Sequence, residues 1–360
     1  MRVLLLGAYG TFGRRIFDGL RRTPDFELIA AGRDLARAQA LQPDRAIALD
    51  TRADDFAEQV KRSKPEIVIH TAGPFEGQDY RVAEAAMAAG AHYIDLADGR
   101  GFVCGFAALD ERARLANVLL LSGASSVPTL HAAAVDALSE GWREVLSIET
   151  GITPGNQTER GLATVATILA YVGKPFAVWH EGRWQMRFGW QDGVVENYSA
   201  PVGRRRLANC DIPDLALFTE RYRGVQSVRF RAGLELGLLH QGLSLLSWLV
   251  RARLVPPMAQ FARPLKAMSE WLLPFGSDHG AMHVRISGID GSGLAAEKRF
   301  ELVATNGDGP QIPGSAAVVI AGKLLRGEIT QRGAMPCVGV VTLEEYLAAL
   351  KPYSIEARFT

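Results

Sequence analysis

Short apolar runs and helix-like segments alternate through the first 122 residues of the chain. Val3–Leu6 is a continuous apolar run, as expected for a strand buried on both faces of a parallel sheet. Six strand-like runs alternate with helix-like segments in this region, and this order predicts the doubly wound parallel sheet of a Rossmann domain, an α/β fold. The expected strands are Val3–Leu6, Phe26–Ala31, Ala46–Leu49, Glu66–Thr71, His92–Leu96 and Val118–Ser122, and the expected helices are Thr11–Thr23, Leu35–Leu41, Asp54–Ser63, Asp79–Ala89 and Phe106–Ala116.

The rhythm changes after Gly123, where strand-like segments, helices and turn pairs no longer alternate regularly. A second, mixed α+β domain is therefore expected to follow the Rossmann domain. We expect a dinucleotide-binding domain over 1–125, a substrate or dimerisation domain over 126–305, and a C-terminal segment over 306–360 that packs back on the first domain. The segments expected after Gly123 are helices at Thr129–Leu138, Gly161–Tyr171 and Pro313–Arg326, a strand at Val145–Thr150, and hairpins within Phe176–Asn197 and over His283–Asp290 with Leu294–Ala304.

A glycine-rich loop lies directly after the first strand and opens the first helix. Its spacing is GxxGxxG, formed by Gly7, Gly10 and Gly13, with Ala8 where the commonest dinucleotide fingerprint has glycine. The first glycine permits a tight turn, the second lets the backbone approach a pyrophosphate, and the third lets the helix pack closely on the strand. Amides at the helix start, including those of Thr11 and Phe12, are expected to receive the phosphates.

The end of the second strand favours NADP over NAD. NAD-binding domains usually place a carboxylate there for the ribose 2′-hydroxyl, whereas this chain has Ala31 and Gly32 followed by Arg33. A guanidinium can hold a 2′-phosphate through paired hydrogen bonds. Asp34 keeps NAD open as the alternative cofactor, because a strand that ends one residue later would make Asp34 the ribose partner.

Two later strand ends belong to the same crevice, because ligands of open α/β sheets collect at the carboxyl ends of the strands. Asp50, after the third strand, is a candidate acceptor for the adenine amino group or else a turn residue. Ala72, Gly73 and Pro74, after the fourth strand, have the small side chains needed where the backbone passes over a cofactor ribose.

Composition and charge exclude several classes of protein. Hydrophobic residues make up 48% of the 360 residues and charged residues 22%, as in a soluble globular protein with a sizeable core. The formal net charge of +1 argues against a nucleic-acid-binding protein. The three cysteines lack CxxC spacing, which argues against a disulfide framework and favours the reducing cytoplasm. Met1-Arg2 leads directly into Val3–Leu6, so no signal peptide is expected.

The stretch Leu234–Val250 is the most apolar part of the second half of the chain. It contains Glu235, His240 and Gln241 and is shorter than the roughly 20 apolar residues that a spanning helix needs. We expect a helix that is buried in the protein or in a subunit interface, with attachment to a membrane surface as the alternative. A homo-oligomer, most simply a homodimer through residues 126–305, is expected on the same grounds.

Five segments together resemble the saccharopine dehydrogenase-like oxidoreductase family: Gly7–Gly13, Ala72–Phe75, Ala85–Leu96, Gly307–Pro310 and Gly333–Cys337. The resemblance covers the first 140 residues and again residues 307–345. It implies a Rossmann domain, a substrate domain inserted before a C-terminal return segment, and NAD(P)-dependent redox chemistry on a small amine- or carbonyl-bearing substrate. It does not imply saccharopine, because the middle of the sequence shows no recognisable set of arginines for a dicarboxylic amino acid.

Two residues are candidates for acid–base catalysis by their position. Asp95 follows the fifth strand and shares a strand face with Tyr93, although it is also suited to cap the next segment. His131 follows the loop after the sixth strand, which is expected to border the nicotinamide. A lone histidine near a helix start is also commonly structural.

No metal site is expected. His279 and His283 are four residues apart, but Gly280 and the hairpin context are incompatible with a helical metal-binding pair. Cys337 is expected to be a buried apolar side chain. A regulatory protein that binds the cofactor without turnover and a lipid-associated reductase are the alternatives to an NADP-dependent oxidoreductase.

Overall fold

The computed structural model describes residues 1–360, apart from the side chain of residue 163, and these residues form two compact units. The first unit contains residues 1–130 and 310–349, and the second contains residues 131–309 and 350–360. The C-terminal segment is therefore divided. Its larger part belongs to the first unit, but its last strand belongs to the second.

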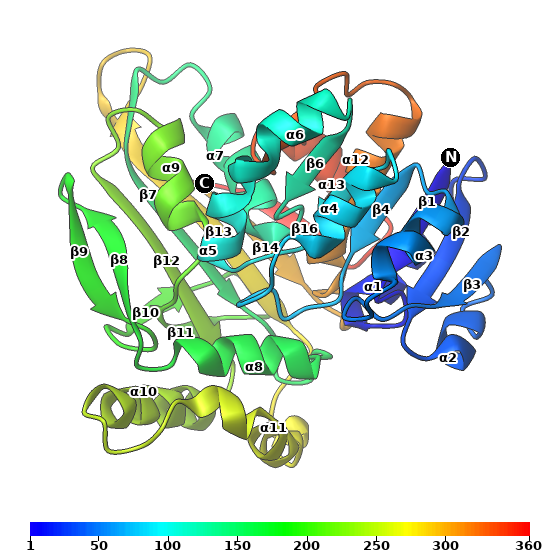
Figure 1. Cartoon of the computed structure of the whole chain (residues 1–360). Helices are drawn as coiled ribbons and strands as arrows, with labels where there is room; N and C mark the ends of the chain where they lie inside the picture. The colour runs from blue at the N-terminus through cyan, green and yellow to red at the C-terminus, as the bar shows by residue number, and fades with distance from the viewer. The chain divides into compact units, whose positions relative to one another are not determined.

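The first unit is built on a parallel sheet with the order β15-β6-β5-β4-β1-β2-β3, of which Figure 1 labels β6, β4, β1, β2 and β3. The doubly wound Rossmann sheet predicted from the sequence is confirmed, and β15 from the C-terminal segment extends it beside β6. The strands are β1 Arg2–Leu6, β2 Glu27–Gly32, β3 Arg45–Ala48, β4 Ile67–His70, β5 His92–Asp95, β6 Leu119–Ser122 and β15 Gly333–Pro336. The helices are α1 Thr11–Leu20, α2 Leu35–Gln39, α3 Phe56–Ser63, α4 Arg81–Ala88, α5 Arg100–Cys104, α6 Asp110–Leu115, α12 Gln311–Leu325 and α13 Leu343–Leu350.

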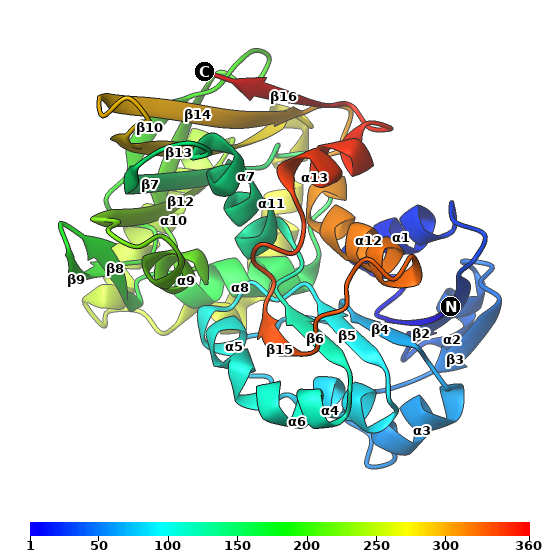
Figure 2. The same ribbon diagram turned by 90° about the horizontal axis from the view of Figure 1, so that it is seen from above.

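Helix α12 packs closely on α1, and small residues make this possible. Figure 2 shows α1 and α12 on one side of the parallel sheet and α3, α4 and α6 on the other. A Cβ atom on Gly19 would lie 2.9 Å from Val318 Cγ2, and one on Gly314 would lie 3.1 Å from Ile16 Cγ1. A larger side chain at either position would therefore press on the facing helix, and α12 belongs to the core of the first unit although it is distant in sequence.

The second unit is built on a mixed sheet with the order β10-β11-β12-β7-β13-β14-β16. The central strand β7 pairs in parallel with β12 and antiparallel with β13, and the hairpin β8–β9 joins the sheet through β12. The mixed second domain predicted from the sequence is confirmed. Its strands are β7 Glu144–Thr153, β8 Pro175–His180, β9 Arg183–Phe188, β10 Val194–Asn197, β11 Arg204–Asn209, β12 Ser227–Leu234, β13 Gly280–Ile289, β14 Ala295–Ala304 and β16 Ile355–Phe359.

Helices cover the apolar face of this sheet. An apolar cluster beneath α8, α10 and α11 contains Leu169, Val172, Trp190, Ala208 and Met258, all buried. Trp190 is the largest of these side chains and is 1% exposed. The helices of the unit are α7 His131–Leu138, α8 Leu162–Tyr171, α9 Asp214–Arg221, α10 Gly237–Arg251 and α11 Ala262–Glu270.

The helix predicted over 234–250 is present as α10, and of the two alternatives predicted for it, burial within this chain does not hold for its outer face. Leu238, Leu245 and Trp248 are 73%, 62% and 55% exposed, whereas His240 and Ser247 are buried. Ser247 Oγ donates to the backbone oxygen of residue 189 at 2.6 Å, so a polar residue faces inward because it satisfies a buried carbonyl. A role in a subunit interface stays a prediction. Within the described residues, no helix combines the length and apolar character that a bilayer crossing requires.

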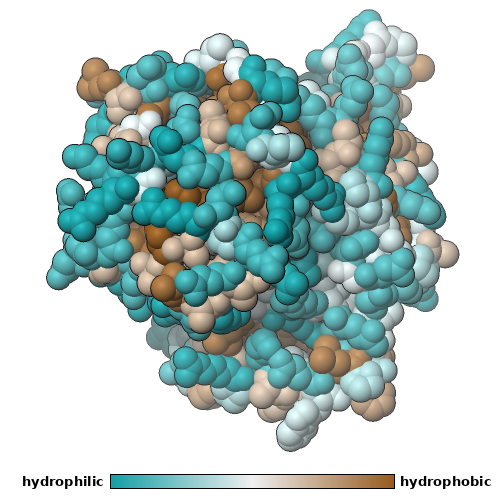
Figure 3. Space-filling view, turned by 90° about the vertical axis from the view of Figure 1, so that its right-hand side faces the viewer, coloured by the Kyte–Doolittle hydropathy of each residue, from teal (hydrophilic) through white to brown (hydrophobic). Residues whose placement is uncertain are grey.

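Hydrophilic residues predominate on the face shown in Figure 3, and hydrophobic residues appear there in small groups. This distribution agrees with a composition of 48% hydrophobic residues that mostly fill the two cores.

Candidate functional site

The glycine loop has the backbone geometry that a bound pyrophosphate needs. Gly7 has a φ of +78°, a conformation that favours glycine, and its N–H donates to Ala31 O at 2.9 Å. A Cβ atom on Gly13 would lie only 2.1 Å from Gly7 O, so α1 can begin here only with glycine at position 13. Thr11 and Phe12 start α1, whose first amides have no intrahelical acceptor and are suited to phosphate oxygens.

The loop after β4 lies beside the glycine loop. Thr71 Oγ1 donates to Leu6 O at 2.8 Å, which ties the end of β4 to the end of β1. A Cβ atom on Gly7 would lie 2.7 Å from Thr71 Oγ1, so the two loops are in contact. Ala72, Gly73 and Pro74 continue from this point, and the predicted juxtaposition of these residues with the glycine loop is what the strand order produces.

The structure at the end of β2 distinguishes Arg33 from Asp34, the two residues that could bind the adenosine ribose of the cofactor or its 2′-phosphate. The strand ends at Gly32, so exposed Arg33 is the first residue beyond it. Asp34 is the N-cap of α2, and its Oδ1 accepts from the Arg37 backbone N–H at 3.1 Å. The Asp34 backbone N–H donates to Tyr9 Oη at 2.9 Å. Asp34 is therefore engaged by its own helix, which leaves Arg33 as the better placed ligand group.

Three further side chains near the end of β2, those of Tyr9, Arg14 and Arg37, were not found from the sequence. The Arg37 guanidinium lies 4.4 Å from the centre of the Tyr9 ring, and both line a cavity of about 230 Å³ together with Arg14. Arg37 lies in α2, whereas Arg33 precedes the extended N-cap residue Asp34, so their spacing of four residues is not a helical pair and gave no signal. Tyr9 belongs to the glycine loop and Arg14 to α1, and only the fold brings them to the end of β2.

Asp50 lies after β3 and is exposed. Its Oδ1 accepts from the Arg52 backbone N–H at 3.0 Å, the arrangement of a turn residue. Asp50 therefore acts as a turn residue in this structure, which is one of the two interpretations made from the sequence. Its role as an acceptor for the adenine amino group stays a prediction.

Asp95 ends β5 in a fully buried position. Its Oδ1 accepts three hydrogen bonds, from the backbone N–H groups of Ala97 and Gly123 at 2.9 and 2.8 Å and from Ser122 Oγ at 3.1 Å. Burial raises the pKa of this carboxyl to about 6, and the three donors oppose that shift because they favour the carboxylate. Asp95 thus organises the loop after β6, and it also has a pKa suited to proton exchange near neutral pH.

His131 begins α7 and pairs with an acid that the sequence did not reveal. Its Nδ1 lies 2.5 Å from Asp214 Oδ2, and both side chains are buried. Among the described residues, His131 Nε2 has no hydrogen-bond partner. Asp214 is 83 residues away in the sequence and lies at the start of α9, so no local pattern could have joined the two. An acid at Nδ1 fixes the tautomer and the orientation of an imidazole.

The described residues contain no group of three or more His, Cys, Asp and Glu side chains that could hold a metal ion. Cys337 is buried, and burial raises the pKa of its thiol to about 12, so a thiolate is not available there for a ligand or a nucleophile.

Comparisons with known proteins agree with this geometry. Residues 3–121 match the family model described as Saccharopine dehydrogenase NADP binding domain, which confirms the resemblance seen in the sequence. No curated protein sequence matches the chain. The fold is similar to that of apo saccharopine dehydrogenase (L-Glu forming) from Saccharomyces cerevisiae, with a TM-score of 0.70 and 15% identity over 100% of this chain and 99% of that chain. It is also similar to homospermidine synthase from Legionella pneumophila in complex with NAD, with a TM-score of 0.58 and 13% identity over 100% and 91% of the two chains.

The glycine loop can be tested by placing a charge in it. Gly10→Asp puts a carboxylate beside Gly7 O, which a Cβ atom at position 10 would approach to 3.1 Å. We expect NADPH binding to fall at least a hundredfold, because the carboxylate occupies the phosphate position and repels the phosphates. Fluorescence titration with NADPH measures this loss. Gly322→Asp on α12 is the matched control, since a Cβ atom there meets only the flexible tip of Arg326. Unchanged affinity of the folded Gly10→Asp variant would contradict the site.

Proposed function

We propose that this chain is an NADP-dependent oxidoreductase of the saccharopine dehydrogenase-like type. In this proposal it transfers a hydride to or from a small amine- or carbonyl-bearing substrate. The observation that carries the proposal is the contact between Gly7, Gly13 and Thr71 at the carboxyl end of a parallel sheet, within residues that match an NADP-binding domain model.

A bound nicotinamide would supply or accept the hydride, and the chain would bind and orient the cofactor. The amides at the start of α1, those of Thr11 and Phe12, would hold the pyrophosphate, while the Gly10 N–H donates to Gly7 O at 2.9 Å and closes the turn. Ala72–Pro74 would pass over the ribose that carries the nicotinamide, and Asp50 would accept from the adenine amino group. The residues fit such a cofactor because Gly7 and Gly13 let α1 begin directly against the end of β1 and the loop after β4, which places the first amides of the helix at the carboxyl edge of the sheet.

NADP is favoured over NAD by the charge around the end of β2. Arg33 directly follows the strand, and Arg37 and Arg14 line the adjacent cavity with Tyr9. Asp34, the residue that would bind a ribose 2′-hydroxyl, instead caps α2. A 2′-phosphate would therefore meet guanidinium groups at this position, with Asp34 Oδ1 engaged by the Arg37 backbone N–H. NAD remains the alternative cofactor, and the homospermidine synthase with the similar fold was solved with NAD.

Arg33→Ala tests the cofactor assignment. One charge-assisted hydrogen-bonding group contributes roughly 1.5–3 kcal/mol, so NADPH affinity should fall about ten- to a hundredfold while NADH affinity stays nearly unchanged. Higher ionic strength should narrow the wild-type preference for NADPH, because part of the attraction is screened. Fluorescence titrations of both cofactors give the comparison, with exposed Arg62→Ala on α3 as the control. Equal affinity of the wild type for NADH and NADPH would remove the NADP assignment and leave the dinucleotide site intact.

We further propose Asp95 and His131 as the acid–base candidates. The three donors to Asp95 all reach Oδ1, so Oδ2 is the oxygen available for a proton. His131 Nε2 is held in place by the Asp214 contact on the opposite ring nitrogen. Both side chains are buried, so proton exchange with a substrate requires that the substrate reach a site from which water is excluded.

Measurements of stability and activity over a range of pH, made on the wild type and on Asp95→Asn, separate the structural role of Asp95 from a role in proton exchange. Burial raises the pKa of Asp95 from 3.8 to about 6, so ionisation lowers the stability of the folded chain as pH rises through this window, by about 2–3 kcal/mol. The Asn variant keeps an oxygen acceptor for the three donors and should lose this pH dependence in urea unfolding. If Asp95 also exchanges a proton with substrate, NADPH oxidation with a panel of amines and carbonyl compounds should lose its pH limb near 6.

His131→Gln serves as the parallel variant in that activity screen. Loss of turnover with retained NADPH binding would support an acid–base role, and full turnover would make the pair with Asp214 structural. Tight NADPH binding by the wild type without turnover of any amine or carbonyl compound would favour the cofactor-binding regulatory protein.

A lipid-associated reductase is the second candidate function, because an exposed apolar surface favours it. Besides α10, the α11 region exposes Met268 at 58%, Trp271 at 80% and Phe275 at 74%. Arg251 is the last residue of α10, and Arg253 follows the helix. Aromatic and leucine side chains beside arginines are typical of segments that lie in the interfacial region of a membrane with anionic lipids.

Flotation with vesicles tests this second function. Wild-type protein should float with vesicles that contain phosphatidylserine and should be recovered less with phosphatidylcholine alone. Leu245→Ser combined with Trp248→Ser should reduce recovery at least several-fold, because two apolar groups of the surface are removed. Leu115→Ser is the control, since Leu115 is 82% exposed in the first unit. Protein that stays with the soluble fraction and elutes as a dimer, which the double variant dissociates, would assign the surface to a second copy of the chain.

A further inference from the structure

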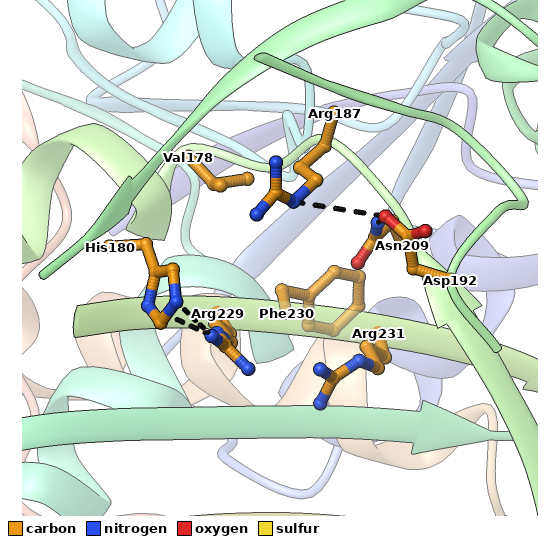
Figure 4. A pocket seen from close by; sticks show the side chains of 8 residues that line it. All are labelled: Val178, His180, Arg187, Asp192, Asn209, Arg229, Phe230 and Arg231. Carbon is orange, nitrogen blue, oxygen red and sulfur yellow. Dashed lines mark hydrogen bonds and ion pairs between the residues drawn. The ribbon is translucent and has the colours of Figure 1, made fainter. Parts of the chain in front are cut away.

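A charged cavity of about 270 Å³ lies within the second unit, between the β8–β9 hairpin and the edge of β12. Figure 4 shows the guanidinium groups of Arg187, Arg229 and Arg231 and the ring of His180 around this space. The cavity is lined by Val178, His180, Arg187, Asp192, Asn209, Arg229, Phe230 and Arg231.

The cavity exists because two partners share one edge of β12. Strand β8 pairs with β12 at Val228↔Trp179, and β11 pairs with it from Arg231↔Asn209 onward. Between Val228 and Arg231, this edge of β12 is paired with neither strand, because β8 has diverged from it and the pairing with β11 starts only at Arg231. Arg229 and Arg231 alternate with Phe230 along this stretch, so both arginines lie on the same face of the strand.

The backbone at the rim of the cavity, over residues 190–192, is strained. Trp190 and Asp192 have φ angles of +63° and +54°, and a bulky residue such as tryptophan rarely adopts this conformation. The Trp190 N–H donates to Asn209 O at 2.8 Å, and the Asn209 N–H donates to Gln191 O at 3.0 Å. Burial of the Trp190 indole in the apolar cluster compensates for the strain. The same segment carries Asp192 to the cavity, where its Oδ2 accepts from Asn209 Nδ2 at 2.8 Å.

The charges of the cavity are not balanced by its own acids. Three arginines and one aspartate line it, and Arg187 Nε is 3.8 Å from Asp192 Oδ2. Glu149 on β7 is shared: its carboxylate lies 4.0 Å from Arg229, 3.4 Å from Arg231 and 3.2 Å from Arg285. Arg231 Nε is buried and has no hydrogen-bond partner among the described residues.

Arg229 shows the same excess of positive charge. Its Nη2 lies 2.8 Å from both ring nitrogens of His180, whereas the carboxylate nearest to the Arg229 guanidinium, that of Glu149, is 4.0 Å away and is shared with two other arginines. Burial lowers the pKa of both groups, and the neighbouring Arg231 and Arg229 charges lower the pKa of Arg229 and His180 respectively. A further anion would relieve this repulsion.

We propose that this cavity binds the carboxylate or phosphate group of a small anionic molecule. Arg187, Arg229 and Arg231 would hold the oxyanion through charge-assisted hydrogen bonds, and Val178 and Phe230 would contact the carbon part of the molecule. The volume suits a molecule of a few carbon atoms that carries one or two such groups. The site lies wholly within the second unit, and the proposal does not rest on the proposed cofactor function.

Isothermal titration of the full chain tests the site with glutarate and inorganic phosphate as anionic probes and glutaramide as the neutral control. Glutarate or phosphate should bind the wild type, glutaramide should not, and the dissociation constant should rise at least tenfold in Arg229→Gln. Binding should be unchanged in Arg183→Gln, because Arg183 is exposed on the same hairpin and does not line the cavity. It should also be unchanged in Arg33→Ala, which separates this site from the cofactor phosphate site.

The outcomes decide both the site and the ligand class. Binding of glutarate alone assigns a carboxylate ligand, and binding of phosphate alone assigns a phosphate ester. Absence of binding by both probes at millimolar concentration, or equal affinity in the wild type and Arg229→Gln, would overturn the proposal. If Arg229→Gln fails to fold by far-ultraviolet circular dichroism, Arg187→Gln replaces it, because the Arg187 side chain is 35% exposed and its loss leaves the sheet intact.

Discussion

The first unit depends on the close approach of α1 to the end of β1. Any side chain at position 13 would overlap Gly7 O, so the helix can begin where it does only because glycine is present there. This contact sets the direction of the first helix and leaves its first amides directed at the carboxyl edge of the sheet. The same turn touches Thr71, which bonds to Leu6 O and so joins β4 to β1. The glycine loop and the adjacent ends of β1 and β4 are therefore held together by one set of close contacts.

Where packing and chemistry are local, the sequence predicted them well. Buried runs such as Val3–Leu6 and the glycine spacing identify strands and loop directly, since each depends on residues that are neighbours in the chain. The pair of His131 and Asp214 could not be predicted, because a contact across 83 residues leaves no periodic trace. The exposure of α10 was missed for a related reason: hydropathy ranks Ser247 below Leu245, but a buried carbonyl needs the serine.

The arginines of the second unit show how topology creates chemistry that composition does not reveal. In the sequence they are scattered over β9 and β12 and form no recognisable set. Strand alternation places Arg229 and Arg231 on one face, and the diverging hairpin brings Arg187 opposite them. Glu149 from a third strand is shared among several of these cations and leaves them incompletely neutralised. The local excess of positive charge in this unit therefore follows from its strand pairings, and the net charge of +1 for the whole chain does not reveal it.

The chain passes between the two units three times, since residues 310–349 return to the first and residues 350–360 to the second. During synthesis, residues 1–130 leave the ribosome well before β15 and α12 are made. Until then the outer edge of β6 has no strand beside it, and the glycine face of α1 is uncovered. An open strand edge and an uncovered helix face in a nascent chain invite association with other chains. Because the first unit is discontinuous in the sequence, its folding can be completed only after residues 310–349 have been synthesised.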